Sequence, residues 1–222
     1  MPKFAACLPY SYDAPIVGEY PAQYYFDMPR GEPLARVIVI SPDIQFADGR
    51  SPHYAPGSDE LRWLAEAVTS ARAKYIPYVI VAMHKPCLTT EDKPCESGEQ
   101  LANMLIEKKV DLVLMGHVHA YERTFPLTCI KAGQEGPGCV VHKRSDYLQT
   151  AGTTFITVGT GGRKLRELHD NDPEEAYFAK RFGAKQGRYG IGKLAIDDTH
   201  MTHQFIDASS GQVLDEVTIL RR

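Results

Sequence analysis

Three histidines stand directly after apolar runs of the kind that form buried strands. His84 follows the run 77–83, and His117 and His119 follow the run 111–115. Neutral imidazole nitrogens are common ligands of zinc, iron and manganese ions. A single histidine in such a place would be better interpreted as a polar residue at a strand end. Because three of them follow neighbouring strands, we predict that His84, His117 and His119 are metal ligands.

The sequence Gly-His-Val-His at 116–119 suggests how two of these side chains are presented. If these residues continue the strand, His117 and His119 point the same way, because side chains alternate with a period of two. Gly116, which has no side chain, would then let the backbone and a metal ion approach each other closely.

The segments around the histidines alternate between predicted strands and helices. Short apolar runs at 36–41, 77–83 and 111–115, the first rich in β-branched residues, predict buried strands. Apolar residues recur every three or four positions in 58–75 and 98–109, which predicts two helices. Two βαβ units of this kind form a parallel sheet with right-handed crossovers, and such sheets bind ligands at the carboxyl ends of their strands. The histidines should therefore share one edge of the sheet.

The second half of the chain changes character. Residues 155–159 predict a strand that runs into Gly159-Thr-Gly-Gly162, a tight turn beside the site whose spacing does not fit a phosphate-binding glycine loop. A short helix is expected from Asp172. His200 and His203, three apart in a late strand, should lie on opposite faces and at the surface. Antiparallel strands are predicted at 190–197, 201–206 and 213–220.

We expect a single domain made of three stretches. Residues 1–33, rich in proline and tyrosine and without periodicity, predict an irregular lead-in. Residues 34–124 hold the βαβαβ unit with the histidine motifs, and residues 125–222 are mostly antiparallel strands. The fold class is therefore α/β (α+β), with both parallel and antiparallel sheet.

The composition of the 222 residues excludes several classes of protein. Hydrophobic residues make up 43% and charged residues 24%, so the chain can bury a sizeable core. With a net charge of -3 and no basic block, nucleic acid is not expected as an obligate partner. No apolar run approaches the roughly 18 residues that span a bilayer. The first residues show no apolar stretch typical of a signal peptide.

Four of the five cysteines form closely spaced pairs in predicted loops, Cys87 with Cys95 and Cys129 with Cys139. Such pairs are typical of disulfides in exported proteins, although free thiols in surface loops are the alternative. Cys7 has no partner in this scheme.

At this point the sequence resembles a family. Val81-Ala-Met-His84-Lys-Pro86 and Asp111-Leu-Val-Leu-Met-Gly-His-Val-His-Ala-Tyr-Glu-Arg123 look like the last two metal motifs of the calcineurin-like metallophosphoesterases. Gly-His-Val-His-Ala-Tyr-Glu-Arg is most similar to the purple acid phosphatase branch. The resemblance continues through 157–162 and 205–215 and covers most of 35–220. The loop from Lys85 to Cys95 looks most like that of secreted bacterial members.

The resemblance implies a layered β-sandwich flanked by helices and a metal-dependent phosphoester hydrolase, either a phosphatase or a phosphodiesterase. The complete enzyme would use two metal ions, from iron, zinc or manganese, to activate water and clamp a phosphate ester. By analogy, His84 and His117 would bind one ion and His119 the other. The parent protein would be secreted or periplasmic.

The sequence departs from the family in its first motifs. Gly-Asp-x-Gly, Gly-Asp-x-x-Asp or -Tyr, and Gly-Asn-His-Glu or -Asp, which supply two aspartates, an asparagine and a histidine, do not occur. We therefore expect the C-terminal portion of a phosphoesterase that lacks the first strands and helices of the complete fold. Three neutral histidines do not offset two dications, so we expect at most one zinc here. An uncovered sheet edge would favour self-association.

Three functions remain open. The first is a phosphoester hydrolase whose parent chain was longer, with the missing aspartates encoded upstream. The second is a non-catalytic metal-binding or interaction remnant of such an enzyme. The third is a mononuclear zinc hydrolase built on the three histidines. The sequence assigns no catalytic or substrate-binding residue.

Four further residues are weaker candidates. Asp43, just after the first predicted strand, could stand in as a metal ligand, and His53 could reach the site from its loop. Glu122 and Arg123 are expected to brace the histidine turn by hydrogen bonds and not to touch substrate.

Overall fold

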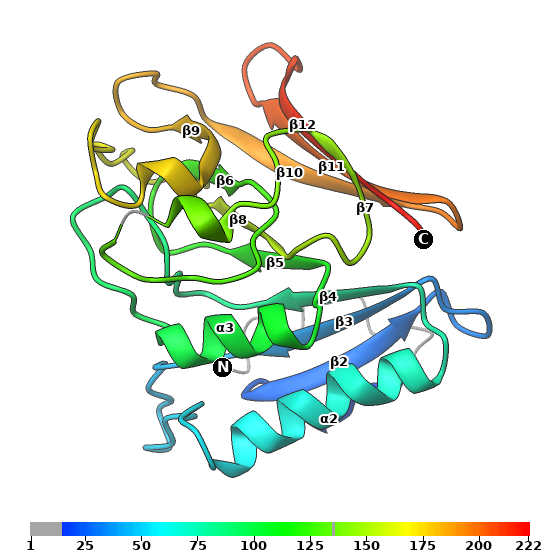
Figure 1. The fold of residues 1–222 in the computed structure, drawn as a ribbon. Helices are drawn as coiled ribbons and strands as arrows, with labels where there is room; N and C mark the ends of the chain where they lie inside the picture. The colour runs from blue at the N-terminus through cyan, green and yellow to red at the C-terminus, as the bar shows by residue number, and fades with distance from the viewer. Residues whose placement is uncertain (1–14, 135) are drawn as a thin grey trace.

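The computed structural model describes residues 15–134 and 136–222, so Cys7 lies outside the described residues. Its strands form two sheets (Figure 1). The larger has the order β1-β2-β3-β4-β5-β8-β6-β9, and the smaller has the order β10-β11-β12-β7. The chain is therefore a layered α/β structure with mixed sheets, as the sequence predicts.

The larger sheet contains β1 (Val17–Glu19), β2 (Gln23–Met28), β3 (Ala35–Ile40), β4 (Tyr78–Ala82), β5 (Leu112–Met115), β6 (Tyr121–Thr124), β8 (Thr154–Val158) and β9 (Phe178–Phe182). The smaller contains β7 (Asp146–Leu148), β10 (Gly190–Ile196), β11 (His200–Asp207) and β12 (Val213–Leu220). The helices are α2 (Asp59–Ala73) and α3 (Glu99–Glu107), with short 3₁₀ turns η1 (Pro137–Cys139) and η2 (Glu175–Tyr177).

The predicted βαβαβ unit is present, with β3, β4 and β5 parallel and adjacent. Helix α2 begins where expected, because Ser58 accepts a hydrogen bond from the N–H of Leu61 at 3.1 Å and caps the helix. Alternate residues of β4 then build two cores. Val79 and Val81 pack in the cluster that includes α2 and α3, whereas Ile80 packs with residues of the smaller sheet. The larger sheet is thus covered by helices on one face and by the smaller sheet on the other (Figure 1).

The second half agrees with the prediction in its main strands. β10, β11 and β12 are antiparallel neighbours, while β7 adds in parallel to β12. The helix expected from Asp172 is only the single turn η2. Strands β6, β7 and β9 are not predicted by the sequence, because none of them is a continuous apolar run like β4 or β5.

The expectation that residues 1–33 form an irregular lead-in is wrong for the part that the structure describes. β1 and β2 form an antiparallel pair, and β2 pairs with β3. A buried ion pair joins these strands: Arg36 donates from Nε to Asp27 Oδ1 at 2.6 Å and from an Nη to Oδ2 at 2.8 Å. Arg36 is fully buried and also donates to the carbonyl of Ala67 in α2. The strand is hard to recognise in the sequence because its aromatic and polar residues do not alternate cleanly.

Both predicted disulfides are present, Cys87–Cys95 and Cys129–Cys139. Each closes a loop on the larger sheet, and the first loop follows His84 directly. Among the described residues, no helix is long and apolar enough to cross a membrane.

The prediction that His203 lies at the surface is wrong. Its side chain is 3% exposed, because alternate residues of β11 face the larger sheet, where the ring stacks near Tyr121. Neither ring nitrogen has a hydrogen-bond partner. Burial lowers the pKa of His203 from 6.5 to about 4, against the opposing effect of Asp215. His200 does lie nearer the surface, beside Asp197.

His203 should make the protein acid-labile. Its pKa is lower in the folded state, so the unfolded chain binds the extra proton first, and stability falls as the pH drops from about 6.5 toward 4. Between about pH 7.5 and about pH 5 we expect the free energy of unfolding of the unchanged protein to fall by about 2 kcal/mol. In His203→Phe most of this fall should be absent. Urea unfolding of both proteins at both pH values measures it. Equal losses in the two proteins would contradict the assignment.

Apolar side chains are exposed at one sheet edge and on the smaller sheet. Ile16, Val17 and Tyr20 lie around the edge strand β1, while Leu148 and Ile191 are 56% and 62% exposed on the smaller sheet. Exposed strand edges and apolar patches favour association. We expect light scattering to give an average mass that rises with protein concentration. A constant monomer mass across a wide concentration range would count against it.

Candidate functional site

His84 and His117 meet at the carboxyl ends of β4 and β5. The ladder between these strands continues beyond them, because the N–H of Gly116 donates to the carbonyl of His84 at 3.1 Å. Nε2 of His84 and Nδ1 of His117 are 3.1 Å apart, and the two rings meet edge to face with centroids 4.9 Å apart. The structure therefore brings two of the three predicted ligands together.

The histidine motif is a turn and not the end of a strand. His117 has φ +62°, and two tight turns follow, with Val118 N–H donating to Gly116 at 2.7 Å and Ala120 N–H donating to Val118 at 2.8 Å. The expectation that His117 and His119 alternate with a period of two is therefore wrong. A left-handed backbone is uncommon for a non-glycine residue and is often found at functional sites.

The close approach expected of Gly116 toward a metal stays a prediction, and the glycine that the backbone requires is Gly159. A Cβ at Gly116 would lie 3.5 Å from Nδ1 of His84, which is an ordinary contact. A Cβ at Gly159 would lie 1.8 Å from the carbonyl oxygen of Val118, so only glycine fits there. The N–H of Gly159 also donates to Ala120 at 2.9 Å. The prediction that Gly159–Gly162 forms a tight turn beside the histidines is thus confirmed.

His119 lies in the same turn but does not join the pair. Its carbonyl accepts a hydrogen bond from the N–H of Arg166 at 2.9 Å, and its ring makes no hydrogen bond to His84 or His117 in the described part of the chain. Within residues 15–134 and 136–222, no group of three or more histidine, cysteine, aspartate or glutamate side chains is arranged to hold a metal ion.

Two charged residues that the sequence does not single out flank the ring of His117. Nε2 of His117 lies 2.8 Å from Nζ of Lys93 and 3.0 Å from Oε2 of Glu96. Lys93 lies inside the loop that the Cys87–Cys95 disulfide closes, and Glu96 follows Cys95 directly. Their positions three residues apart, around the end of this loop, were the only sequence signal, and it does not indicate which side chain they face.

The surroundings keep both imidazoles neutral. Burial lowers the pKa of His84, and the neighbouring ammonium of Lys85 lowers it further. Burial also lowers the pKa of His117, with Glu96 opposing this effect and Lys93 adding to it. A neutral imidazole is the form that binds metal ions, so the pair is suited to act as ligand near neutral pH.

The expectation that Glu122 and Arg123 brace the histidine turn is wrong. Glu122 is fully buried and accepts hydrogen bonds from Oγ1 of Thr89 at 2.6 Å, and from N–H and Oγ1 of Thr90 at 2.9 and 2.8 Å. It therefore anchors the disulfide loop. Arg123 points the other way and donates two hydrogen bonds to Asp215, at 2.6 and 2.8 Å, which joins the two sheets.

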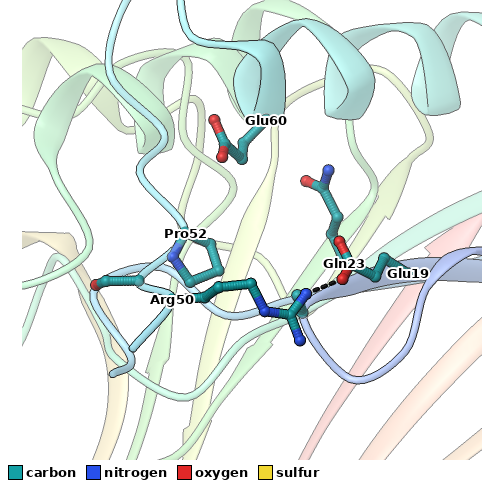
Figure 2. A pocket seen from close by; sticks show the side chains of 7 residues that line it. Glu19, Gln23, Arg50, Pro52 and Glu60 are labelled. Atoms are coloured by element: carbon teal, nitrogen blue, oxygen red, sulfur yellow. Dashed lines mark ion pairs between the residues drawn. The ribbon is translucent and has the colours of Figure 1, made fainter. Parts of the chain in front are cut away.

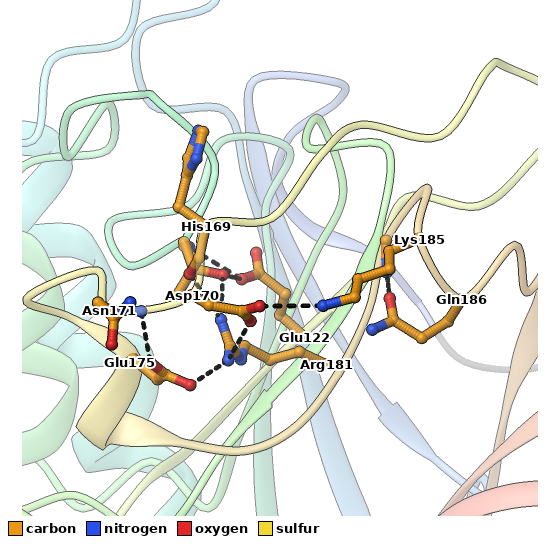
Figure 3. A network of polar contacts seen from close by, with 10 residues as sticks. Glu122, His169, Asp170, Asn171, Glu175, Arg181, Lys185 and Gln186 are labelled. Carbon is orange, nitrogen blue, oxygen red and sulfur yellow. Dashed lines mark hydrogen bonds and ion pairs between the residues drawn. The ribbon is translucent and has the colours of Figure 1, made fainter.

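A polar network extends this anchor toward the surface. An Nη of Arg181 donates to Oγ1 of Thr90 at 3.1 Å and to the carbonyl of His169 at 3.0 Å. The same guanidinium pairs with Glu175 (Figure 3). Burial raises the pKa of Glu122, while its hydrogen bonds to the two threonines lower it. The network holds the loop that presents Lys93 and Glu96.

The weaker candidates lie around the histidine pair. Asp43 pairs with Lys85, so its carboxylate is already engaged, and its role as a ligand stays a prediction. His53 is exposed and lines a cavity of about 420 Å³ together with Asp43 and Glu96. A neighbouring pocket shares Ser51 and Pro52 with this cavity and has no histidine in its lining; Arg50 pairs there with Glu19 (Figure 2).

The geometry of the pair fits one metal ion. Two nitrogens bound to the same tetrahedral zinc at about 2.0–2.1 Å are roughly 3.3 Å apart. The observed separation between His84 and His117 is 3.1 Å, and the two lone pairs would converge from neighbouring strand ends. Glu96 provides a negative charge 3.0 Å from Nε2 of His117. His84 and His117 could therefore hold an ion without rearrangement of the sheet.

Comparisons with known proteins identify the family of this chain. Residues 9–121 match the calcineurin-like phosphoesterase family, and residues 152–216 match the iron/zinc purple acid phosphatase-like protein C family. Purple acid phosphatase 21 of Arabidopsis thaliana is 30% identical over 155 residues, 68% of this chain and 31% of that protein. A nucleotide pyrophosphatase/phosphodiesterase of Hordeum vulgare is 26% identical over 189 residues, 80% of this chain and 48% of that protein.

Solved structures share the fold. A purple acid phosphatase from seeds of yellow lupin (Lupinus luteus) superposes with a TM-score of 0.68 at 22% identity, over 90% of this chain and 32% of that one. The chain thus spans between a third and a half of the length of these relatives. The order and spacing of the histidine motifs, the layered fold and the family matches agree, and the chain belongs to the calcineurin-like phosphoesterase family, in its purple acid phosphatase-like branch.

Proposed function

We propose that this chain supplies the histidine ligands of a metal-dependent phosphoester hydrolase. His84 and His117 bind one metal ion together, and His119 serves a second ion in the complete dinuclear centre. The observation that carries the proposal is the 3.1 Å separation between Nε2 of His84 and Nδ1 of His117 at the carboxyl edge of a parallel sheet.

In this proposal the residues of this chain hold the metal ions in position, and they do not by themselves complete the reaction. His84 and His117 present neutral nitrogens, because burial lowers the pKa of both rings. The φ of +62° at His117 turns its ring toward His84, and Gly159 lets the turn pack closely behind it. Iron, zinc or manganese ions, when bound, would supply an activated water and positive charge for the phosphoryl oxygens.

The substrate class is a phosphate ester. Relatives carry names as different as nucleotide pyrophosphatase/phosphodiesterase in Hordeum vulgare and phosphoenolpyruvate phosphatase in Allium cepa, so the alcohol or nucleotide part is not assigned. The cavity beside His53, which opens next to Glu96, is the place that we propose for that part of the substrate.

A non-catalytic metal-binding module is the second candidate. Two observations favour it: only two of the three histidines converge in the described residues, and these residues hold no group of three ligands. A relative 33% identical over 123 residues is named probable inactive purple acid phosphatase 1 in Arabidopsis thaliana. A mononuclear zinc hydrolase on the three histidines is less well supported, because the described residues do not arrange all three as one ligand group.

We also propose that the complete protein is secreted or periplasmic. Two disulfides close surface loops, and disulfides persist in oxidising compartments. The Cys87–Cys95 bond lies beside the histidine pair, so a reducing compartment would loosen the loop that flanks the site.

Calorimetric titration of the metal-free protein with zinc tests the ligand assignment. We expect one equivalent to bind, with affinity reduced more than about a hundredfold in His84→Ala and in His117→Ala, because each removes one of two converging nitrogens. His119→Ala should retain most of the binding, since its ring makes no hydrogen bond to either nitrogen of the pair in the described part of the chain.

His169→Ala, which changes an exposed histidine outside the pair, is the control and should bind zinc as the unchanged protein does. Wild-type affinity in both His84→Ala and His117→Ala would overturn the assignment. Release of p-nitrophenol from p-nitrophenyl phosphate in the presence of zinc, iron or manganese then separates the candidates. Zinc bound without turnover selects the non-catalytic module.

A further inference from the structure

Two opposite charges that the metal site itself does not require approach one nitrogen of His117. Nζ of Lys93 and Oε2 of Glu96 approach the same nitrogen, Nε2, at 2.8 and 3.0 Å. The direct distance between the ammonium and the carboxylate is 3.6 Å, longer than either contact to the ring. Both side chains are only about a quarter exposed or less, at 26% and 20%. Both groups therefore approach Nε2 from the same side; Lys93 makes the hydrogen bond, and Oε2 of Glu96 is buried without a hydrogen-bond partner among the described residues.

A neutral imidazole cannot satisfy both contacts at once. It carries one N–H and one lone pair, so Nε2 either accepts a hydrogen bond from Lys93 or donates one to Glu96. In the first case the proton sits on Nδ1, and that nitrogen offers no lone pair toward His84. In the second case the proton sits on Nε2, and the lone pair of Nδ1 faces Nε2 of His84 across 3.1 Å.

We propose that Lys93 and Glu96 are positioning residues that compete for Nε2 of His117 and thereby set its tautomer. Glu96 selects the tautomer that can bind a metal ion together with His84, and Lys93 selects the one that cannot. The affinity of the pair for metal then depends on the balance between these two side chains. This consequence rests on the proposed function, in which His117 is a ligand through Nδ1.

The loop that carries the two residues is fixed well enough to hold this geometry. The Cys87–Cys95 disulfide closes it, and the N–H groups of Glu96 and Ser97 both donate to the carbonyl of Pro86, at 3.1 and 3.3 Å. On its other side, the loop is anchored by the buried carboxylate of Glu122. A carboxylate that accepts the second N–H of a ligand histidine is a known way to fix its tautomer and orientation.

Nitrogen-15 NMR of the metal-free protein at about pH 8 measures the tautomer directly. Lys93→Met should shift His117 toward the form with the proton on Nε2, and Glu96→Gln should shift it toward the form with the proton on Nδ1. Zinc titration of the same variants should give roughly tenfold tighter binding for Lys93→Met and roughly tenfold weaker binding for Glu96→Gln.

Local charge alone would also change zinc affinity in these directions, so a matched pair is needed. Lys85→Met and Asp43→Asn remove the same charges from a neighbouring ion pair; Lys85 also lies 3.8 Å from Oε1 of Glu96, so Asp43→Asn is the stricter control. Both variants should leave the tautomer of His117 unchanged. If they shift it as strongly as the loop variants do, or if Lys93→Met and Glu96→Gln leave it as in the unchanged protein, the proposal is wrong.

Two outcomes separate this proposal from the function on which it builds. A tautomer that shifts as expected in a protein that binds no zinc supports the competition and overturns the ligand assignment. If zinc binding is lost in His84→Ala but neither loop variant changes the tautomer of His117, the ligand assignment is supported and the competition is overturned. Lys93→Met leaves the carboxylate of Glu96 in place, so it keeps the test decisive if Glu96→Gln fails to fold.

Discussion

The parallel register of β4 and β5 is the constraint on which the site depends. Ile80 lies opposite Leu112 and Ala82 opposite Leu114, and the ladder runs on until Gly116 donates to the carbonyl of His84. The two loops therefore leave the sheet side by side, with their histidines already within reach of each other. Both strands are buried on both faces, so a slip of one residue would exchange the two cores and is strongly disfavoured.

A single strand, β6, connects this edge to the rest of the molecule. Its neighbouring residues point to opposite faces of the sheet, as the geometry of a strand requires. Glu122 reaches the disulfide loop through Thr89 and Thr90, while Arg123 reaches Asp215 in the smaller sheet. The loop beside the histidines and the packing of the two sheets are thus held by adjacent residues, which links the stability of the layered fold to the arrangement of the site.

The sequence predicted those parts of the fold that depend on burial alone. Strands β3, β4 and β5 are short apolar runs, and their order with two amphipathic helices was enough to place His84 and His117 at one edge. The turn at His117 could not be predicted, because its positive φ depends on packing against Gly159. The burial of His203 likewise depends on a face of β11 that only the second sheet covers.

Contacts from the disulfide loop were the other feature that the sequence did not reveal. Lys93 and Glu96 are ordinary polar residues in a loop, and only the closure by Cys87–Cys95 and the anchor at Glu122 turn them toward the ring of His117. Residues of this kind act through a ligand and carry no signature of their own. They become visible only when the distances around the ligand are known.

Diffraction from zinc-soaked crystals of this protein, with anomalous data collected at the zinc edge, tests the central claim most directly. The account predicts a zinc ion at about 2.0–2.1 Å from Nε2 of His84 and from Nδ1 of His117. An ion held by Nε2 of His117, or one held elsewhere while this pair stays free, would contradict it.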